Sequence, residues 1–318
     1  MPDPITHYWF GQRVLSVLDL KIFEEIDPLV FDRALQGPDP WSTVGFYGGK
    51  NKRFACRSNQ MHKEKTGEFL LALTAEAKRH SEVFSVLVGN ICHYCLDRTV
   101  HPYIIYRSGD YDGTADTYSQ RSGHVRMERG IDSLIIRKYF RKTPWRFPVV
   151  KVIYKLKKYP QYLKQPLNSA YFNVYGWEDG FDAFNKGLKD EVLFYGLMQD
   201  PVGVVRCLLR PISRGHTNYS AYSYYKSDAD AEEKDYLNEN RAEWKHPYDP
   251  SLKFTMSISE MIDKAKSDAL LMISAAYDAV FKGDEIKLEQ IYGNANYSTG
   301  FDCEDPRNKM KPVFDPQI

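Results

Sequence analysis

The sequence predicts an all-α fold, arranged as a single multi-helix domain over residues 1–318. Apolar residues recur at helical spacing in most long segments, and few runs show the alternation of a half-buried strand. No internal repeat and no clear linker divides the chain. Hydrophobic residues make up 43% and charged residues 27%, an ordinary globular composition that allows a substantial core.

Capping residues and helix breakers divide the chain into expected helices. In chain order these are 6–19, 65–80, a helix that starts at Ser81 and carries the histidine-rich stretch described below, 122–140, 149–158, 179–198, 202–212 and 257–281. Thr6 and Ser81 are expected to cap the first and third of these helices. Ser257 and Glu260 have the spacing of a capping box.

Irregular segments are expected between and after these helices. Glycine and proline predict turns at 37–41 and 47–51 and a loop at 110–114. The polar segment 226–240 fits either a helix or a loop. The tail, about 293–318, is rich in Asn, Asp, Gly and Pro and is expected to be irregular.

The net charge of +1 hides a strongly basic stretch. Between residues 133 and 177 there is no Asp or Glu, and aromatic residues are interleaved with ten cations: Arg137, Lys138, Arg141, Lys142, Arg146, Lys151, Lys155, Lys157, Lys158 and Lys164. Such a pattern suits peripheral contact with an anionic membrane through 133–164, or nucleic acid. The alternative is a solvated face balanced by the acidic run 228–239.

Cysteine usage and the N-terminus bear on location. The five cysteines show no secretory spacing, and Cys92 with Cys95 forms a lone CxxC without a second pair, so both are expected to pack as small apolar residues. We find no signal-peptide pattern at the N-terminus and no apolar run of about 18 residues that would span a membrane. The expected location is the cytoplasm, with a peripheral position at the inner membrane face as an extension of it.

The stretch from His93 to His101 carries the strongest chemical signal. His93, Asp97 and His101 are spaced by four residues, so on a helix they form one stripe. His124 and Glu128 repeat this spacing further along the chain. A single such pair is usually a surface pair of little energetic value. Several aligned imidazoles and carboxylates in apolar surroundings instead predict zinc or another divalent transition metal, because burying Asp97 without a cation is costly.

Three further candidates lie upstream and are weak taken singly. His7 lies at the start of the first expected helix, Asp39 lies in a Gly-Pro-Asp-Pro turn, and His62 lies in what reads as a polar loop. The other histidines, His80, His216 and His246, have no partner at useful spacing and are expected to be structural or surface residues.

In chain order, the eight candidate residues resemble the ligand series of the zinc-dependent phospholipase C family: His7, Asp39, His62, His93, Asp97, His101, His124 and Glu128. The series is also similar to that of the related single-strand-specific zinc nucleases. The final His-x3-Glu resembles the phospholipase branch, because the nuclease branch tends to use Asp there. The resemblance implies an all-helical fold with a cluster of zinc ions at the base of a cleft.

The resemblance also implies a division of the ligands among three metal ions. Asp39, His62, His93 and Asp97 would hold one ion. A second ion would be held by His101, His124 and Glu128, with an open position left for water. His7 and Asp97 would hold the third, with Asp97 bridging two ions.

Three features of the chain depart from the secreted members of the family. The N-terminal Trp whose amine completes the third site is absent. By hypothesis, the amine exposed by removal of Met1 would take that role, and the cluster would hold two or three zinc ions. The gap between Asp97 and His101 is shorter. The choline-binding residues have no clear counterpart.

The main functional hypothesis is a zinc-dependent phosphodiester hydrolase of the phospholipase C type. Zinc would neutralise the phosphate and lower the pKa of a bound water to about 7. Asp39, as the resemblance suggests, would orient or deprotonate that water, and Glu128 is the second expected catalytic residue. The substrate would be a phospholipid or another phosphodiester, drawn in by the basic stretch at the mouth of the cleft.

Two alternatives remain open. A nuclease or nucleotidase would use the same zinc cluster and would need aromatic side chains to stack bases. A non-catalytic, zinc-stabilised helical protein would bind a membrane or a partner. An HD-type phosphohydrolase is disfavoured because the chain has no adjacent His-Asp pair.

Overall fold

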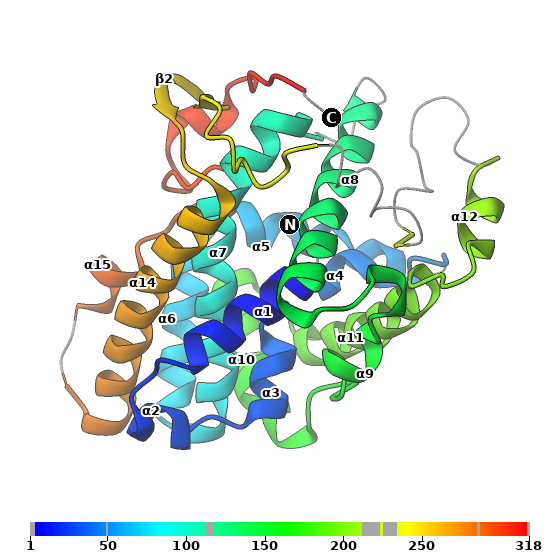
Figure 1. The fold of residues 1–318 in the computed structure, drawn as a ribbon. Helices are drawn as coiled ribbons and strands as arrows, with labels where there is room; N and C mark the ends of the chain where they lie inside the picture. The colour runs from blue at the N-terminus through cyan, green and yellow to red at the C-terminus, as the bar shows by residue number, and fades with distance from the viewer. Residues whose placement is uncertain are drawn as a thin grey trace.

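The computed structural model describes residues 4–48, 50–111, 117–211, 223–224, 234–284 and 287–316. Helices dominate these residues (Figure 1). The α-helices are α1 (Pro4–Leu15), α2 (Leu20–Glu24), α3 (Pro28–Ala34), α4 (Pro40–Thr43), α5 (Cys56–Lys63), α6 (Thr66–Ala77), α7 (Phe84–Ser108), α8 (Tyr118–Ile135), α9 (Val149–Val152), α10 (Lys164–Tyr175), α11 (Gly180–Met198), α12 (Val204–Leu209), α14 (Ile258–Tyr277) and α15 (Leu288–Tyr292). The all-α prediction is confirmed.

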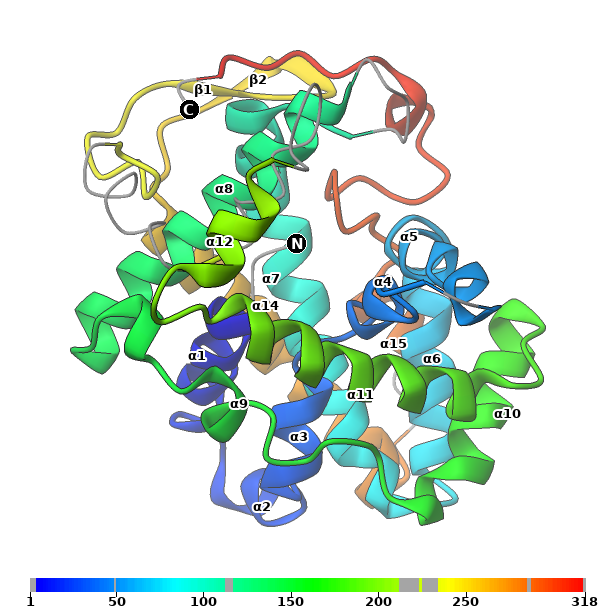
Figure 2. The same cartoon turned by 90° about the vertical axis from the view of Figure 1, so that its right-hand side faces the viewer.

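The longest helix, α7, forms the centre of the fold. It packs against α14, α3, α6, α8 and α1 (Figures 1 and 2). Nearly all of its side chains are buried. Gly89 allows α3 to approach closely, because a Cβ at this position would lie 2.4 Å from the Cβ of Ala34. The polar stripe of α7 is therefore held in the interior of the protein.

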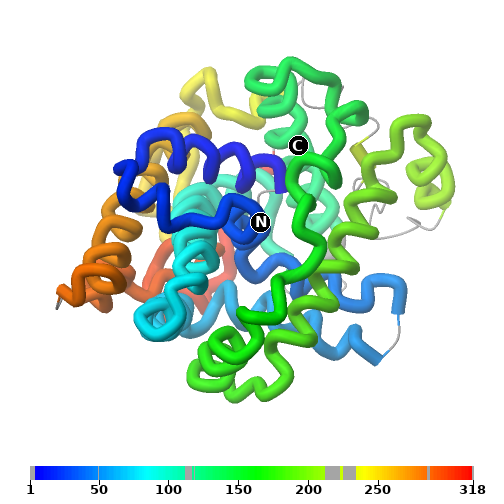
Figure 3. The backbone as a smooth tube through the Cα atoms, turned by 90° about the horizontal axis from the view of Figure 1, so that it is seen from below, coloured from blue at the N-terminus to red at the C-terminus, as the bar shows by residue number. Residues whose placement is uncertain are grey.

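A second group of helices covers one side of α7. The helix α11 packs against α4, α10 and α9, and it lies across the molecule from α14 when the fold is seen from below (Figure 3). A short antiparallel hairpin, β1 (Trp244–His246) and β2 (Asp249–Phe254), lies against the end of α7. Among the described residues, no helix is both long enough and apolar enough to cross a membrane.

Several expected helix boundaries are confirmed. The helices α6, α8, α11 and α14 match expected segments, and the capping box of Ser257 and Glu260 is formed. Two helices extend as π-helical turns, Ile136–Phe140 after α8 and Asp278–Lys282 after α14. The tail from residue 293 is largely irregular, with one short 3-10 turn at Pro306–Lys309. The prediction of a single domain stays a prediction.

Other boundaries differ from the expectation for local reasons. The first helix ends at Leu15, and a second one starts at Leu20 under a cap from Asp19. Ser81 is not a cap but the start of a 3-10 turn, Ser81–Val83, that leads into α7. The helix expected over 149–158 stops at Val152, and the lysine-rich residues 153–158 form a turn and bends instead.

Six of the described α-helices were not predicted: α2, α3, α4, α5, α10 and α15. Residues 164–175 form α10, whose Pro166 lies in the first turn, where proline is tolerated. His62 lies in α5 rather than in a loop, because Ser58, Met61 and His62 form a buried face of an otherwise polar helix. Parts of the predicted segments at 110–114, 202–212 and 226–240, together with His216, lie outside the described residues.

Candidate metal centre

Five segments bring the eight candidate residues together. The central helix α7 supplies His93, Asp97 and His101, and α8 supplies His124 and Glu128. The remaining three come from the N-terminal part of the chain: His7 from α1, Asp39 from the turn before α4, and His62 from α5. Their nitrogen and oxygen atoms form three groups in which all atoms lie within 4.8 Å of one another: His7, His93 and Asp97; Asp39, His62 and His93; His101, His124 and Glu128.

Asp97 joins these groups. Its Oδ1 atom lies 3.3 Å from Nε2 of His7, and its Oδ2 atom lies 3.1 Å from Nε2 of His93. The same Oδ2 atom lies 3.7 Å from Nε2 of His62 and 3.7 Å from Nδ1 of His101. Asp97 is fully buried. This position between imidazoles on two sides is the one a bridging carboxylate needs.

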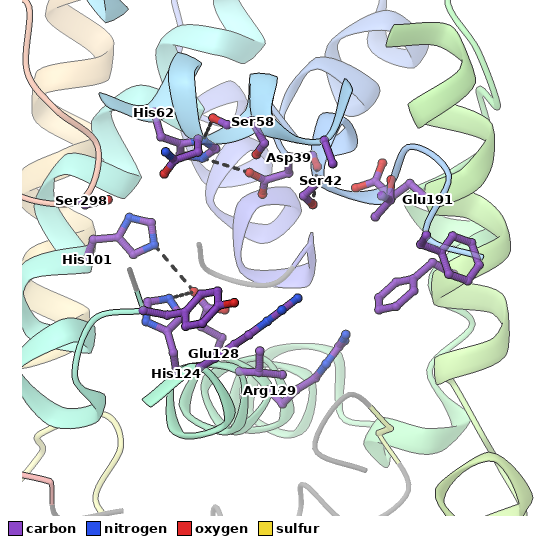
Figure 4. Close-up of a pocket in the computed structure, with 18 of the residues that line it drawn as sticks. Asp39, Ser42, Ser58, His62, His101, His124, Glu128, Arg129, Glu191 and Ser298 are labelled. Atoms are coloured by element: carbon purple, nitrogen blue, oxygen red, sulfur yellow. Dashed lines mark hydrogen bonds and ion pairs between the residues drawn. The ribbon is translucent and has the colours of Figure 1, made fainter. Parts of the chain in front are cut away.

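Asp39 approaches the centre from the opposite side. Its Oδ1 atom lies 3.2 Å from Nε2 of His62 (Figure 4). The same atom lies 3.7 Å from Nε2 of His93. Asp39 occupies the N-cap position of α4, yet its side chain caps no backbone N–H. The carboxylate is therefore directed to the histidines instead of to its own helix. A residue that served only the turn would not be oriented in this way.

The third group lies further along α7. Glu128 Oε1 lies 2.9 Å from Nε2 of His124 and 3.7 Å from Nε2 of His101 (Figure 4). The short spacing from Asp97 to His101 does not prevent this contact, because α7 continues without interruption through Pro102. His101 thus faces both Asp97 on its own helix and Glu128 on α8.

Three histidines are oriented by backbone carbonyl groups. The Nδ1 atoms of His62, His93 and His101 lie 2.6 Å from the oxygen of Ser58, 3.0 Å from that of Leu35 and 3.1 Å from that of Tyr297. With Nδ1–H donating to a carbonyl, each ring directs its unprotonated Nε2 at the carboxylates. Histidines that bind metals are held in this way.

The buried atoms at the centre test whether the donor set fits a cation. Oδ1 and Oδ2 of Asp97, Oδ1 of Asp39 and Nε2 of His62, His93 and His101 are buried without a partner of hydrogen-bond geometry. Burying unsatisfied polar atoms is costly. Imidazole nitrogens and carboxylate oxygens are ligands that zinc prefers. The donor set therefore fits zinc.

The pKa shifts agree with this chemistry. Burial opposes ionisation of Asp97, but His93, His101 and His7 hold its pKa well below the usual range. Glu128 behaves alike: burial opposes its ionisation, and His124 and His101 lower its pKa well below the usual range. Burial lowers the pKa values of His7 and His101. Ionised carboxylates and neutral imidazoles are the forms that bind metals.

His93 is the exception within the group. Burial lowers its pKa, but the carboxylates of Asp97 and Asp39 outweigh burial and leave the pKa raised. A cation between these groups would replace the proton that the two carboxylates otherwise favour on His93.

A further carboxylate positions His7. Asp132, one helical turn after Glu128 on α8, accepts hydrogen bonds from the backbone N–H groups of Ile5 (3.2 Å) and Thr6 (2.8 Å). It also accepts from the hydroxyl groups of Thr6 (2.5 Å) and Tyr224 (3.1 Å). These bonds hold the first turn of α1 against α8, so the helix that carries Glu128 also places His7.

A cavity of about 720 Å³ opens onto part of the centre (Figure 4). Five of the eight residues line it: Asp39, His62, His101, His124 and Glu128. The other three, His7, His93 and Asp97, lie behind them. The centre therefore has a face directed at the cavity and a layer buried in the protein.

Comparison with known protein families agrees with this geometry. A family model described as zinc dependent phospholipase C matches residues 6–181, a segment that contains all eight residues. The chain belongs to the zinc-dependent phospholipase C family. A search of curated proteins and a search of solved structures each found no match. Family membership supports a phospholipase C-like hydrolase and zinc as the metal, and it leaves the role of each residue to be tested.

The remainder of the cavity wall combines apolar, aromatic and basic side chains. Apolar and aromatic side chains from α7, α8, α11 and α12 line it: Ile105, Val125, Phe194, Tyr195, Met198 and Leu209. Lys63, Arg121 and Arg129 add positive charge. Arg129 directly follows Glu128 in sequence and is buried against the rings of Tyr195 and Tyr224, at 5.1 and 4.0 Å.

Sequence reasoning missed Glu191, which also lines the cavity (Figure 4). It forms a buried ion pair of 2.6 Å with Arg33. No local pattern marks either residue, because the pair joins two helices far apart in sequence. The basic stretch 133–164, expected at the mouth, supplies none of the described residues that line the cavity. The N-terminal amine proposed as a ligand lies outside the described residues.

Proposed function

We propose that the chain is a zinc-dependent phosphodiester hydrolase that cleaves phospholipids in the manner of a phospholipase C. One observation carries this proposal: the two ligand groups containing Asp39 with His62 and His101 with Glu128 line the same cavity. A purely structural metal site would be closed on all sides by protein ligands. Here, part of each group is open to a space large enough for a substrate.

The buried layer and the open layer would have different roles. Asp97, His93 and His7 would hold zinc from the buried side of the centre. Asp39, His62, His101, His124 and Glu128 would complete the ligand set from the cavity side. Zinc bound there would supply Lewis acidity, neutralising charge on a phosphodiester and making water acidic enough to ionise near neutral pH.

The residues of the chain would then orient the reactants. Asp39, whose carboxylate is directed away from its own helix, would position the attacking water and accept its proton, as the family resemblance suggests. Lys63, Arg121 and Arg129 would attract the anionic phosphate. The apolar wall formed by Phe194, Met198 and Leu209 would contact the lipid part of the substrate and exclude water.

The first experiment combines metal content with substrate choice. The protein, purified without a metal-affinity tag, would be assayed for zinc and for hydrolysis of bis-p-nitrophenyl phosphate, short-chain phospholipids and single-stranded DNA. We expect two or three zinc ions per chain and chelator-sensitive release of a phosphorylated head group from phospholipid.

Other outcomes would replace the proposal. Cleavage of DNA without cleavage of phospholipid would establish the nuclease alternative. Bound zinc without hydrolysis of any phosphodiester would favour the non-catalytic, zinc-stabilised protein. Absence of bound metal, and no activity after zinc is added, would exclude the metallohydrolase.

A further inference from the structure

An exposed apolar surface lies beside the cavity on the end of α11 and on α12. Its large side chains are Leu193, Leu197, Val202, Val204 and Leu208, all exposed. We call these five residues the α11–α12 surface. Large apolar groups gathered on the outside of a protein usually mark a site that contacts a membrane or another protein.

The same segment presents no exposed acid among its described residues. From 189 to 211 the exposed residues are apolar, small or basic, and they include Lys189 and Arg210. The three acids, Asp190, Glu191 and Asp200, are all buried. Asp190 accepts a hydrogen bond from Lys186 at 2.5 Å, and Glu191 pairs with Arg33. The surface therefore carries apolar groups with positive charge only.

The third buried acid fixes the orientation of α12. The carboxylate of Asp200 accepts hydrogen bonds from the backbone N–H groups of Val205 (3.1 Å) and Arg206 (2.8 Å) and from the hydroxyl group of Ser223 (2.9 Å). These bonds tie the first turn of α12 to the end of α11. The apolar residues of α12 are thus held outward by a buried anchor.

The α11–α12 surface is continuous with the cavity. Phe194, Tyr195 and Met198 on α11 and Leu209 on α12 line the cavity. Leu193, Leu197 and Leu208, which are their neighbours in sequence, are exposed on the outer side of the same helices. A bilayer in contact with the outer side would therefore lie next to the space that leads to the metal centre.

The basic stretch flanks this surface. Gln199 donates a hydrogen bond to the carbonyl oxygen of Phe147 at 2.7 Å, and the ring of Tyr154 stacks on Tyr195 at 5.6 Å. Figures 1 and 2 show α9, α11 and α12 on the same side of the molecule. Exposed Lys151 of this stretch belongs to α9, which packs against α11, and it extends the positive charge.

A second apolar group on the protein supplies a contrast. Val17, Leu20, Phe23 and Leu29, in and around α2, are also exposed. They lie among the acids Asp19, Glu24, Glu25 and Asp27, and α2 lies far from α12 in both views (Figures 1 and 2). An anionic membrane would be repelled from this group and attracted to the other.

We propose that the α11–α12 surface docks the protein onto lipid bilayers that contain anionic lipids, so that the cavity opens toward the membrane. The inference rests on the proposed function for its choice of a phospholipid surface as the partner. Insertion of the apolar side chains would provide affinity, and the adjacent lysines and arginines would select anionic lipid.

The test is co-sedimentation with two kinds of vesicle. One contains phosphatidylcholine alone, and the other contains phosphatidylcholine with about 30% phosphatidylserine, which gives the bilayer a negative surface potential. The variant Val204→Ser/Leu208→Ser removes side chains that are 54% and 66% exposed. Its matched control is Val17→Ser/Leu20→Ser, whose side chains are 54% and 67% exposed. We expect the first variant to bind phosphatidylserine vesicles about tenfold more weakly than wild type, and the control to bind as wild type does.

Two further measurements separate docking from catalysis. Vesicle binding is expected to persist after chelation, because no metal contact is involved, and to weaken as salt is raised. Val204→Ser/Leu208→Ser is expected to hydrolyse a water-soluble phosphodiester at the wild-type rate and phospholipid vesicles more slowly. If the protein hydrolyses no phosphodiester, and the results of the vesicle-binding experiments still hold, then the proposed function fails and the docking surface stands.

A direct probe covers the case of a variant that folds poorly. Cys207 is exposed on α12, between Val204 and Leu208. In a Cys56→Ser/Cys303→Ser background, an environment-sensitive fluorophore on Cys207 is expected to shift to shorter wavelength when phosphatidylserine vesicles are added. Absence of this shift, equal vesicle binding by the two serine variants, or a change in oligomeric state alone would overturn the proposal.

Discussion

At the residue scale, the centre depends on imidazole rings whose two nitrogens have separate tasks. His62, His93 and His101 each direct one nitrogen to a backbone carbonyl and the other to a buried carboxylate. Spacing along the sequence predicted which residues could meet on one helix stripe. The carbonyl partners were not predictable, because Leu35 and Tyr297 are distant in sequence from the rings they orient.

Glu128 is the residue whose removal best separates catalysis from folding. It contacts His124 and His101 and lines the cavity. We expect Glu128→Gln, which keeps the size but removes the charge, to lower the rate constant kcat at least about 100-fold and to lower the melting temperature less than chelation does, because one candidate ligand is lost and no cavity is created. Hydrolysis assays and circular dichroism would check this.

The control for that variant is Glu82→Gln, which changes an exposed carboxylate in the 3-10 turn before α7. It is expected to keep full activity. A Glu128→Gln enzyme with wild-type kcat would show that Glu128 takes no part in the reaction.

Gly37 shapes the pocket around His93. Its φ is +46°, and a Cβ there would lie 2.4 Å from the imidazole ring of His93. Gly176 has a φ of +71° but open space around its Cβ position. We expect Gly37→Ala to displace His93 and to reduce zinc content measurably, whereas Gly176→Ala should cost only about 1 kcal/mol of stability from its backbone conformation. Elemental analysis of both variants, with unfolding curves, distinguishes these effects; equal zinc content in the two would contradict the assignment of His93.

At the scale of elements, the site is assembled by contacts between helices that no local pattern predicts. Asp132 joins α8 to the start of α1, and the ion pair of Arg33 and Glu191 joins α3 to α11. The guanidinium of Arg33 also donates to the carbonyl of Leu188 at 2.9 Å and lies over the ring of Tyr154. This pair sets the distance between the central helices and the cavity wall.

Glu191 should make stability depend on pH. Burial raises its pKa from the ordinary value of 4.5 to about 7, against the opposing effect of Arg33. The folded protein therefore holds this proton more tightly than the unfolded chain does. The resulting stabilisation is fully present below pH 4.5 and is lost as pH rises through 7.

Comparison with Glu191→Gln tests this sign. Between pH 4.5 and 7, the free energy of unfolding of wild type should fall relative to that of the variant, by at most about 1.4 kcal/mol per pH unit. Urea unfolding of chelated protein at several pH values measures the difference, with Glu82→Gln as the exposed control. Parallel profiles for wild type and Glu191→Gln would show that Glu191 is ionised throughout.

At the scale of the whole molecule, the metal centre joins segments from the start of the chain to α8. The eight residues come from α1, the turn before α4, α5, α7 and α8, and Asp97 lies among them without exposure. Metal binding to such a centre is coupled to the stability of the complete fold.

Removal of metal should therefore lower the melting temperature. A ligand present at about 1,000 times its dissociation constant stabilises by about 4 kcal/mol, which for a chain of this length corresponds to a shift on the order of 10 °C. Calorimetry before and after chelation would measure the shift, and readdition of zinc should reverse it. A melting temperature that is insensitive to chelator would mean that no metal is bound within this core.

Spacing along the chain was enough to predict the fold class, the helical stripe of His93, Asp97 and His101, and the pairing of His124 with Glu128, because helical geometry depends only on spacing within one segment. The sequence also predicted the ordered series that includes His7, Asp39 and His62. Packing between distant segments placed His62 on a helix, brought Glu191 to the cavity and separated the buried candidate ligands from those that line the cavity. Spacing along the chain does not encode such packing. The same reason explains why the basic stretch was predicted at the cavity mouth, whereas the structure places its part from Phe147 to Tyr154 along α11, beside an apolar surface that the sequence did not reveal.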